Sequence, residues 1–167
     1  VQMHPQWTEG WGGLGAIQYQ LHHFAAAADA FRHVTALTPK NGPAWALLGL
    51  CEFELGRFGP SLRHLDQGGK LGFGQSQDLP PLVLYHVALL LNRNGEFERG
   101  LDQLAMFVAA GDHSPEIVDA LGLSTLRMPI VPSHIPPSKH DMVTKAGEAA
   151  WTFNAHNVEE ARRLYAE

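Results

Sequence analysis

Histidine is the residue type in this chain that could most readily do chemistry, because an imidazole can bind a metal ion or transfer a proton near neutral pH. The 167 residues include ten histidines and a single cysteine. No two histidines stand at i and i+4, the spacing that puts two imidazoles on one face of a helix. We therefore expect no metal site and no other cofactor, with most histidines in turns or on exposed helix faces.

Nucleophilic and phosphate chemistry also lack their usual patterns. Cys51 lies beside Leu50 in a predicted helix, where a free thiol acts as a small buried apolar side chain. No G-x-S-x-G segment occurs, and the glycine-rich stretch 68–74 lacks the Gly-Lys-Ser/Thr ending of a phosphate-binding loop. Glu159 and Glu160 are predicted to be exposed charges at the start of a last helix. We expect no catalytic residue and no enzymatic activity.

Composition excludes several classes of partner. A net charge of -5 and a pI near 6.0 disfavour nucleic acid and anionic membranes. The longest strongly apolar run, residues 87–91, is far too short to span a bilayer, so no membrane insertion is expected. The first residues do not form a signal peptide, and the cellular compartment stays open. Both ends are predicted to be cut from a longer repeat protein.

One spacing organises the rest of the sequence. Trp11-x-x-Leu14-Gly15 returns 34 positions later as Trp45-x-x-Leu48-Gly49, and Pro5 returns as Pro39. Between the two copies, Ala27-x-x-x-Phe31 stands where a second helix would run. Trp11, Leu14, Ile17 and Leu21 share one face of the first helix, while the small Gly15 and Ala27 allow two helices to approach closely.

The period divides the chain into helix pairs. We predict an all-α solenoid of antiparallel pairs with about eight helices, forming one domain over residues 1–167. Repeats are expected at 8–41, 42–80 and 81–113, followed by an irregular part at 114–138 and a partial repeat at 139–167. His22-His23, Gly56 and Asn94-Gly95 mark the turns inside the three repeats. A Pro-rich loop is predicted at 127–140, then one helix from about Ser138 to Phe153 and another after Asn157.

These motifs resemble the tetratricopeptide repeat family. The resemblance is close for residues 8–66, good for 82–110 and partial for 139–167. It departs from the family where Gln18 and Glu52 replace a usual tyrosine. In that family one face of each first helix lines a concave groove that holds a peptide or a partner helix. Carried over to this sequence, the groove comprises Tyr19, Leu50, Phe53, Tyr85, Leu89, Asn92 and Arg93.

The resemblance implies a protein-interaction scaffold whose partner is a protein or peptide. Asn92 and Arg93 would be the polar anchors of an otherwise apolar groove. Tyr19, Leu50, Phe53 and Leu89 could instead pack between neighbouring repeats. Two further alternatives stay open: a structural segment that only stacks or self-associates through uncapped repeat ends, and a non-catalytic accessory domain of a larger enzyme. The Pro-rich loop could dock onto the groove, act as a ligand, or be a spacer.

Overall fold

The computed structural model describes the backbone of residues 7–166 and the side chains of residues 7–156. Within that backbone the regular elements are all helical, as predicted, with eight α-helices, one short 3-10 helix and no strand. The elements in chain order are α1 (Thr8–Gln20), α2 (Phe24–Leu37), α3 (Gly42–Glu54), α4 (Phe58–Leu71), α5 (Leu79–Arg93), α6 (Phe97–Ala109), α7 (Pro115–Thr125), η1 (Pro132–His134) and α8 (Pro137–Ala166).

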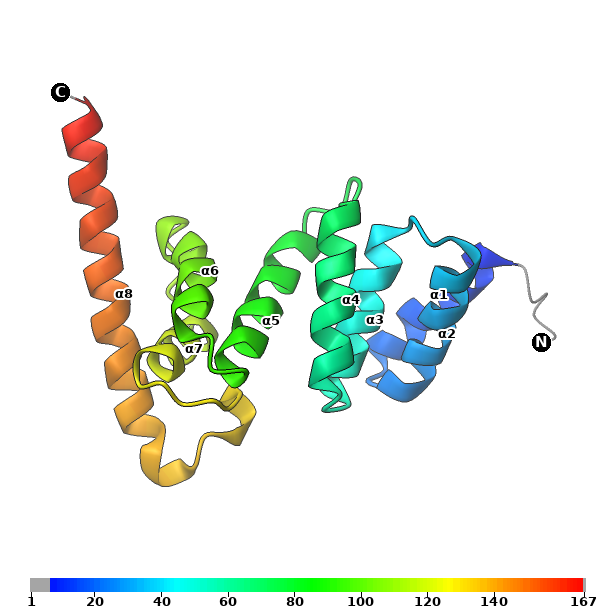
Figure 1. The fold of residues 1–167 in the computed structure, drawn as a ribbon, viewed down its shortest axis with the longest axis horizontal. Helices are drawn as coiled ribbons and strands as arrows, with labels where there is room; N and C mark the ends of the chain where they lie inside the picture. Colours follow the sequence, from blue (N-terminus) through cyan, green and yellow to red (C-terminus); the bar gives the residue numbers. More distant parts are fainter. Residues whose placement is uncertain (1–6, 167) are drawn as a thin grey trace. The chain divides into compact units, whose positions relative to one another are not determined.

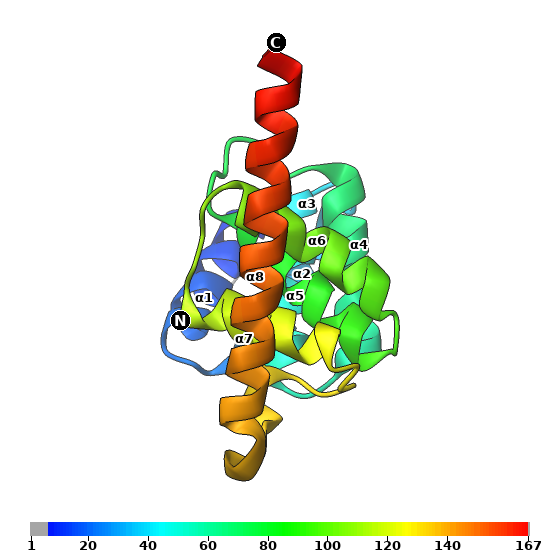
Figure 2. The ribbon, with the colours of Figure 1, turned by 90° about the vertical axis from the view of Figure 1, so that its left-hand side faces the viewer.

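The chain forms two compact units, unit 1 up to His86 and unit 2 from Val87, and the boundary between them in the sequence falls within α5. In unit 1, α1 packs on α2, α3 packs on α4, and α2 packs on α3 (Figure 1). In unit 2, α7 and α8 form the main pair and α6 contacts both of them; Figure 2 shows α8 lying across α7. Neighbouring helix pairs thus pack side by side, as in an all-α helical repeat.

The turns within the three predicted helix pairs share one backbone geometry. His22, Gly56 and Gly95 have φ values of 58°, 69° and 82°, which lie in the left-handed region. In each turn the next residue donates its N–H to a carbonyl five positions earlier, as from His23 to Gln18 and from Arg57 to Glu52. This pattern is the Schellman motif, which satisfies carbonyls at the end of the preceding helix. The predicted turn positions are therefore confirmed.

The small residues of the repeated motif are contact points between helices. A Cβ at Gly15 would stand 2.9 Å from the Phe31 ring, and a Cβ at Gly49 would stand 2.8 Å from Leu65. The contact of Gly49 with Leu65 lies 34 residues after the contact of Gly15 with Phe31. Ser61 takes the place of Ala27 in the second copy, and its hydroxyl donates to the Gly49 carbonyl at 2.8 Å, so the buried oxygen is satisfied.

In both units a tryptophan side chain on a helix donates a hydrogen bond to a turn earlier in the chain. In unit 1 the Trp45 Nε1 donates to the Pro39 carbonyl at 2.9 Å. In unit 2 the Trp151 Nε1 donates to the Asp112 carbonyl, also at 2.9 Å. Because an indole has only one donor and a large apolar body, such a bond lets the ring pack without leaving its N–H unsatisfied.

The prediction of two separate helices after the Pro-rich loop is wrong, because α8 is a single helix. The backbone runs as one helix from Pro137 to Ala166. No proline or glycine stands at the position of the expected break before Asn157. The Asn154 side-chain amide donates to the Ala150 carbonyl at 2.8 Å within the same helix. Glu159 and Glu160 therefore do not start a helix. In the partial repeat, Ala161-x-x-x-Tyr165 has the spacing of Ala27-x-x-x-Phe31, but these two side chains lie outside the described residues.

The Pro-rich segment is less extended than predicted. It contains η1, which contacts α7, and the side chain of Val131 is buried. The segment thus packs on the helix that precedes it. On the other side, α7 and α8 approach closely through two glycines: a Cβ at Gly122 would stand 2.0 Å from the Val143 carbonyl oxygen, and one at Gly147 would stand 1.9 Å from that of Val118.

Candidate functional site

The seven residues predicted to line a groove fall into two groups by burial. Tyr19, Phe53 and Tyr85 are half-buried, and Arg93 is exposed. Leu50, Leu89 and Asn92 are buried, so the structure removes them from the surface that a ligand could touch. For Leu50 and Leu89 the alternative of packing between neighbouring repeats is therefore the better account.

Asn92 is the clearest correction, because it was predicted to be a polar anchor for a ligand. Its side-chain amide instead donates to the Ser124 hydroxyl at 2.5 Å, and it lies 3.5 Å from the Ala120 carbonyl. A Cβ at Gly100 would stand 2.1 Å from the Asn92 Oδ1. The side chain therefore links α5 to α7 inside unit 2, at a place where only glycine fits on α6.

Two aromatic pairs in unit 1 repeat with the period of the sequence. The rings of Tyr19 and Phe24 meet edge to face with centroids 5.6 Å apart, and those of Phe53 and Phe58 meet in the same way at 5.5 Å. Each pair joins the end of one helix to the start of the next. Edge-to-face contacts of this kind fix the orientation of both rings. Tyr19 and Phe53 are thus equivalent positions with defined ring orientations.

His86 joins two of the predicted residues into one cluster. Its ring lies edge-on to Phe53 at 4.6 Å and to Tyr85 at 5.3 Å, with an interplanar angle of 88° in each case. We call Phe53, Phe58, Tyr85 and His86 the aromatic cluster. All four residues belong to unit 1 and come from α3, α4 and α5.

The His86 imidazole is buried and is held by a hydrogen bond within its own helix. Its Nδ1 is 2.8 Å from the Leu82 carbonyl, which can only accept, so Nδ1 carries the proton. Burial lowers the pKa of His86, and the hydrogen bond to Leu82 opposes that shift. Sequence analysis missed this residue because it placed most histidines in turns or on exposed faces. The signal available was its position beside Tyr85 in an apolar helix.

Three other histidines pair with carboxylates. His64 Nδ1 is 2.6 Å from the buried Glu52, which also has the Arg32 guanidinium 3.7 Å away. In unit 2, His113 contacts Glu148 at 2.8 Å and His140 contacts Asp119 at 3.3 Å. Each pair bridges two elements of its own unit, so it contributes to packing between helices. Among the described residues, no three His, Cys, Asp or Glu side chains gather as metal ligands.

Cys51 is buried, as predicted for a small apolar side chain. Burial, with a smaller contribution from nearby carboxylates, raises the pKa of the Cys51 thiol to about 12. A thiol with that pKa is almost entirely protonated at neutral pH and is a poor nucleophile. Across the described residues, no helix combines the length and apolar character needed to cross a membrane.

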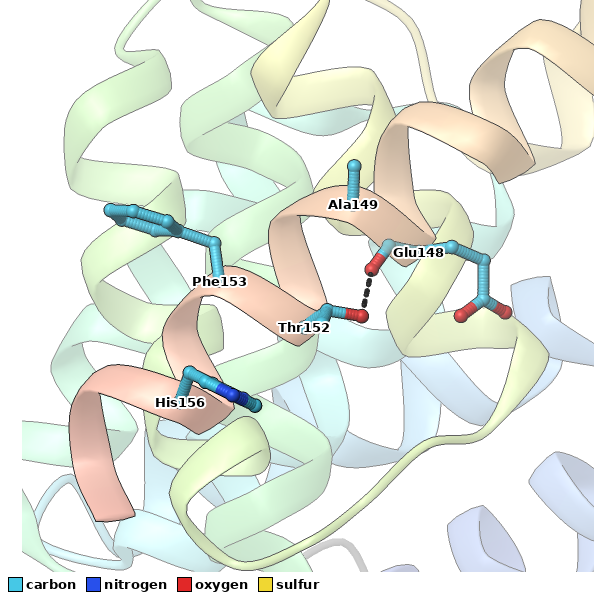
Figure 3. Close-up of a pocket in the computed structure, with 5 residues that line it drawn as sticks. All are labelled: Glu148, Ala149, Thr152, Phe153 and His156. Atoms are coloured by element: carbon cyan, nitrogen blue, oxygen red, sulfur yellow. Dashed lines mark hydrogen bonds between the residues drawn. The ribbon is translucent and has the colours of Figure 1, made fainter. Parts of the chain in front are cut away.

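An open depression lies on the outer side of α8 in unit 2. Its lining comes from one helix: Glu148, Ala149, Thr152, Phe153 and His156. Figure 3 shows these side chains spread along adjacent turns, with the Thr152 hydroxyl bonded to the Glu148 carbonyl at 2.9 Å. The Phe153 ring is 68% exposed. This surface is apolar at its centre, with a carboxylate at one end and an imidazole at the other.

Comparison with known proteins adds no family assignment. The chain matches no protein-family model, and a search of curated proteins finds no match.

Proposed function

We propose that this chain is a tetratricopeptide-type repeat module without catalytic activity, and that unit 1 binds an apolar peptide or partner helix at the aromatic cluster. The observation that carries the proposal is the contact of His86 with both Phe53 and Tyr85. Two half-buried rings from different helices thus contact the same imidazole. Aromatic side chains of this kind contribute a disproportionate share of binding energy at protein interfaces.

The local structure supports a rigid binding surface. The Phe53 ring contacts both Phe58 and His86 edge to face, so it loses little freedom when a ligand binds. The contact of Gly49 with Leu65 shows that α3 also lies close to α4 one turn before Phe53. A surface that is ordered before binding avoids much of the entropic cost of association.

The resemblance to tetratricopeptide repeats supports the same face. Phe53 and Tyr85 occupy positions that face the ligand in that family, and Tyr19 is equivalent to Phe53 one repeat earlier. The proposal retains these three residues and omits Leu50, Leu89 and Asn92, which are buried. The partner is expected to present apolar side chains with helical or extended spacing.

The test begins with peptides selected from a displayed random library against the wild-type chain. Affinity for the best peptide is then measured by fluorescence titration for the wild type and for the double variant Phe53→Ala and Tyr85→Ala. We expect the double variant to weaken binding by about tenfold or more. Phe97→Ala is the matched control, because Phe97 is another half-buried aromatic residue but belongs to unit 2.

Circular dichroism decides what a loss of binding means. If the double variant keeps its helicity and loses the peptide, the cluster is a binding surface. If it loses its helicity, the rings are part of the core and the proposed site is wrong. Selection of no peptide, or equal weakening by Phe97→Ala, would also contradict the proposal.

A further inference from the structure

An apolar stripe along α1 has no cover in the described structure. Leu14, Ile17 and Leu21 follow one another at i, i+3 and i+7, so they lie along one side of the helix. Leu14 is half-buried, and Ile17 and Leu21 are each 56% exposed. A row of aliphatic side chains this exposed on one helix is typical of an interaction surface.

The next repeat shows what covers such a stripe in this protein. The positions 34 residues later are Leu48 and Cys51 on α3 and Leu55, the residue that follows α3. Leu48 and Cys51 are buried in one cluster with Ala27, Ala28 and Phe31 of α2, and Leu55 is partly buried against it. A stripe of the α1 type is therefore covered by a helix that carries two adjacent alanines followed by an aromatic ring.

Helix α8 carries the same side chains on its outer surface. Ala149, Ala150 and Phe153 repeat the spacing of Ala27, Ala28 and Phe31. Ala149 is exposed, Ala150 is half-buried, and the Phe153 ring is 68% exposed. Ala149 and Phe153 also line the open depression in Figure 3. This face is the kind of surface against which α3 packs within unit 1.

The polar residues beside the two faces are also compatible. Where α2 meets α3, Arg32 lies 3.7 Å from Glu52. The residue equivalent to Glu52 on α1 is Gln18, and the residue equivalent to Arg32 on α8 is Asn154. Both members of the ion pair are thus replaced by neutral amides. Docking of the two faces would bury no unpaired charge at this position, and an unpaired buried charge is the most costly defect of an interface.

We propose that the α1 stripe of one copy of this chain docks on the Ala149–Phe153 face of α8 in a second copy. The contact is heterologous, because the two surfaces differ and each copy contributes one of them. The chain itself supplies both halves of a packing arrangement that it already uses between α2 and α3. This inference goes beyond the proposed function, since it involves no residue of the aromatic cluster.

Sedimentation velocity over a range from micromolar to submillimolar protein tests the inference. The wild type should shift from one chain towards larger species as concentration rises. Ile17→Glu and Phe153→Glu should each remain a single chain, because each places a charge in one of the two faces. Met106→Glu is the matched control: Met106 is 58% exposed on α6 and belongs to neither face, so this variant should associate like the wild type.

Mixing the two face variants gives the decisive result. The Ile17→Glu chain retains its α8 face and the Phe153→Glu chain retains its α1 stripe, so an equimolar mixture should form a complex of one copy of each. Circular dichroism verifies folding, and Leu21→Glu replaces Ile17→Glu if the latter loses helicity. A wild type that stays monomeric, an Ile17→Glu chain that still self-associates, or a mixture that forms no complex would overturn the inference. Peptide binding at the aromatic cluster is measured separately and is unaffected by either outcome.

Discussion

Gly15 lies against the ring of Phe31 so closely that a Cβ at residue 15 would stand 2.9 Å from two of its carbons. The ring is itself buried and cannot move aside freely. The same relationship joins Gly49 to Leu65, one period later. The glycine of the repeated motif therefore sets the distance between the two helices of a pair, and its lack of a side chain is a packing requirement.

Gly15→Ala should destabilise the protein although alanine favours helix more than glycine does. Forcing a methyl group into a packed contact costs about 1–3 kcal/mol. Gly13→Ala is the matched control on the same helix, since a Cβ there would meet no atom within 4 Å. It should stabilise by about 0.5–1 kcal/mol. Urea denaturation of both variants checks the two signs, and a stabilising Gly15→Ala would show that α1 and α2 can separate without cost.

His22→Gly should stabilise the protein. His22 has a φ of 58° at the turn where the equivalent residues are Gly56 and Gly95. A side chain in the left-handed region costs about 1–2 kcal/mol, which glycine avoids, while the greater freedom of glycine in the unfolded chain returns part of that gain. The melting temperature of His22→Gly should rise, and that of Gly56→Ala should fall. A fall in both variants would mean that the His22 ring, which contacts Phe24 edge-on, contributes more than the backbone.

Ser124→Ala should destabilise unit 2 more than Thr125→Ala does. Both hydroxyls donate to a carbonyl four positions earlier, at 2.8 Å. Only Ser124 also accepts from the buried Asn92 side-chain amide. Removal of the Ser124 hydroxyl therefore leaves that amide with only the Ala120 carbonyl, 3.5 Å away. An unsatisfied buried donor costs about 1–3 kcal/mol. Chemical denaturation of the two variants measures the difference, and equal losses would contradict the assigned role of Asn92.

Acidification should weaken the contribution of His86 to stability. Burial holds its pKa below the ordinary value of 6.5 in the folded state, so the unfolded chain binds a proton that the folded chain resists. Stability from this residue is present above the ordinary pKa and is lost as pH falls below it. His86→Phe keeps a ring and removes the titration. The unfolding free energy of the wild type should therefore fall relative to that of the variant between about pH 7.5 and about pH 5.5, and a constant difference would contradict this account.

Much of the fold follows from the sequence because its signals are local. The turn at Gly56, the N-cap at Asn41 with Pro43 in the first turn, and the small residues at Gly15 and Gly49 depend on a few neighbouring positions. The continuity of α8 was not predicted, because Asn157 is a weak helix former without being a helix breaker.

The candidate site was predicted only in part, because burial is decided by residues distant in the sequence. Phe53 and Tyr85, predicted to line a groove, are half-buried, so they stay candidates for a binding surface. The sequence pattern could not show that Ser124 would bind Asn92, 32 positions away, and so withdraw it from the surface. Nor could it show that the His86 ring would contact both Phe53 and Tyr85.

The indole hydrogen bonds of Trp45 and Trp151 also give each unit its own optical reporter. Of the four tryptophans, Trp151 is the single one that follows residue 86, and its N–H is bonded to the turn before α7. In a variant that keeps Trp151 and lacks the other three tryptophans, the emission would therefore report the melting of unit 2. In a variant that keeps only Trp45, the emission would report the melting of unit 1. Comparing the two curves would measure the cooperativity between units, a quantity that in repeat proteins depends on the interface between neighbours.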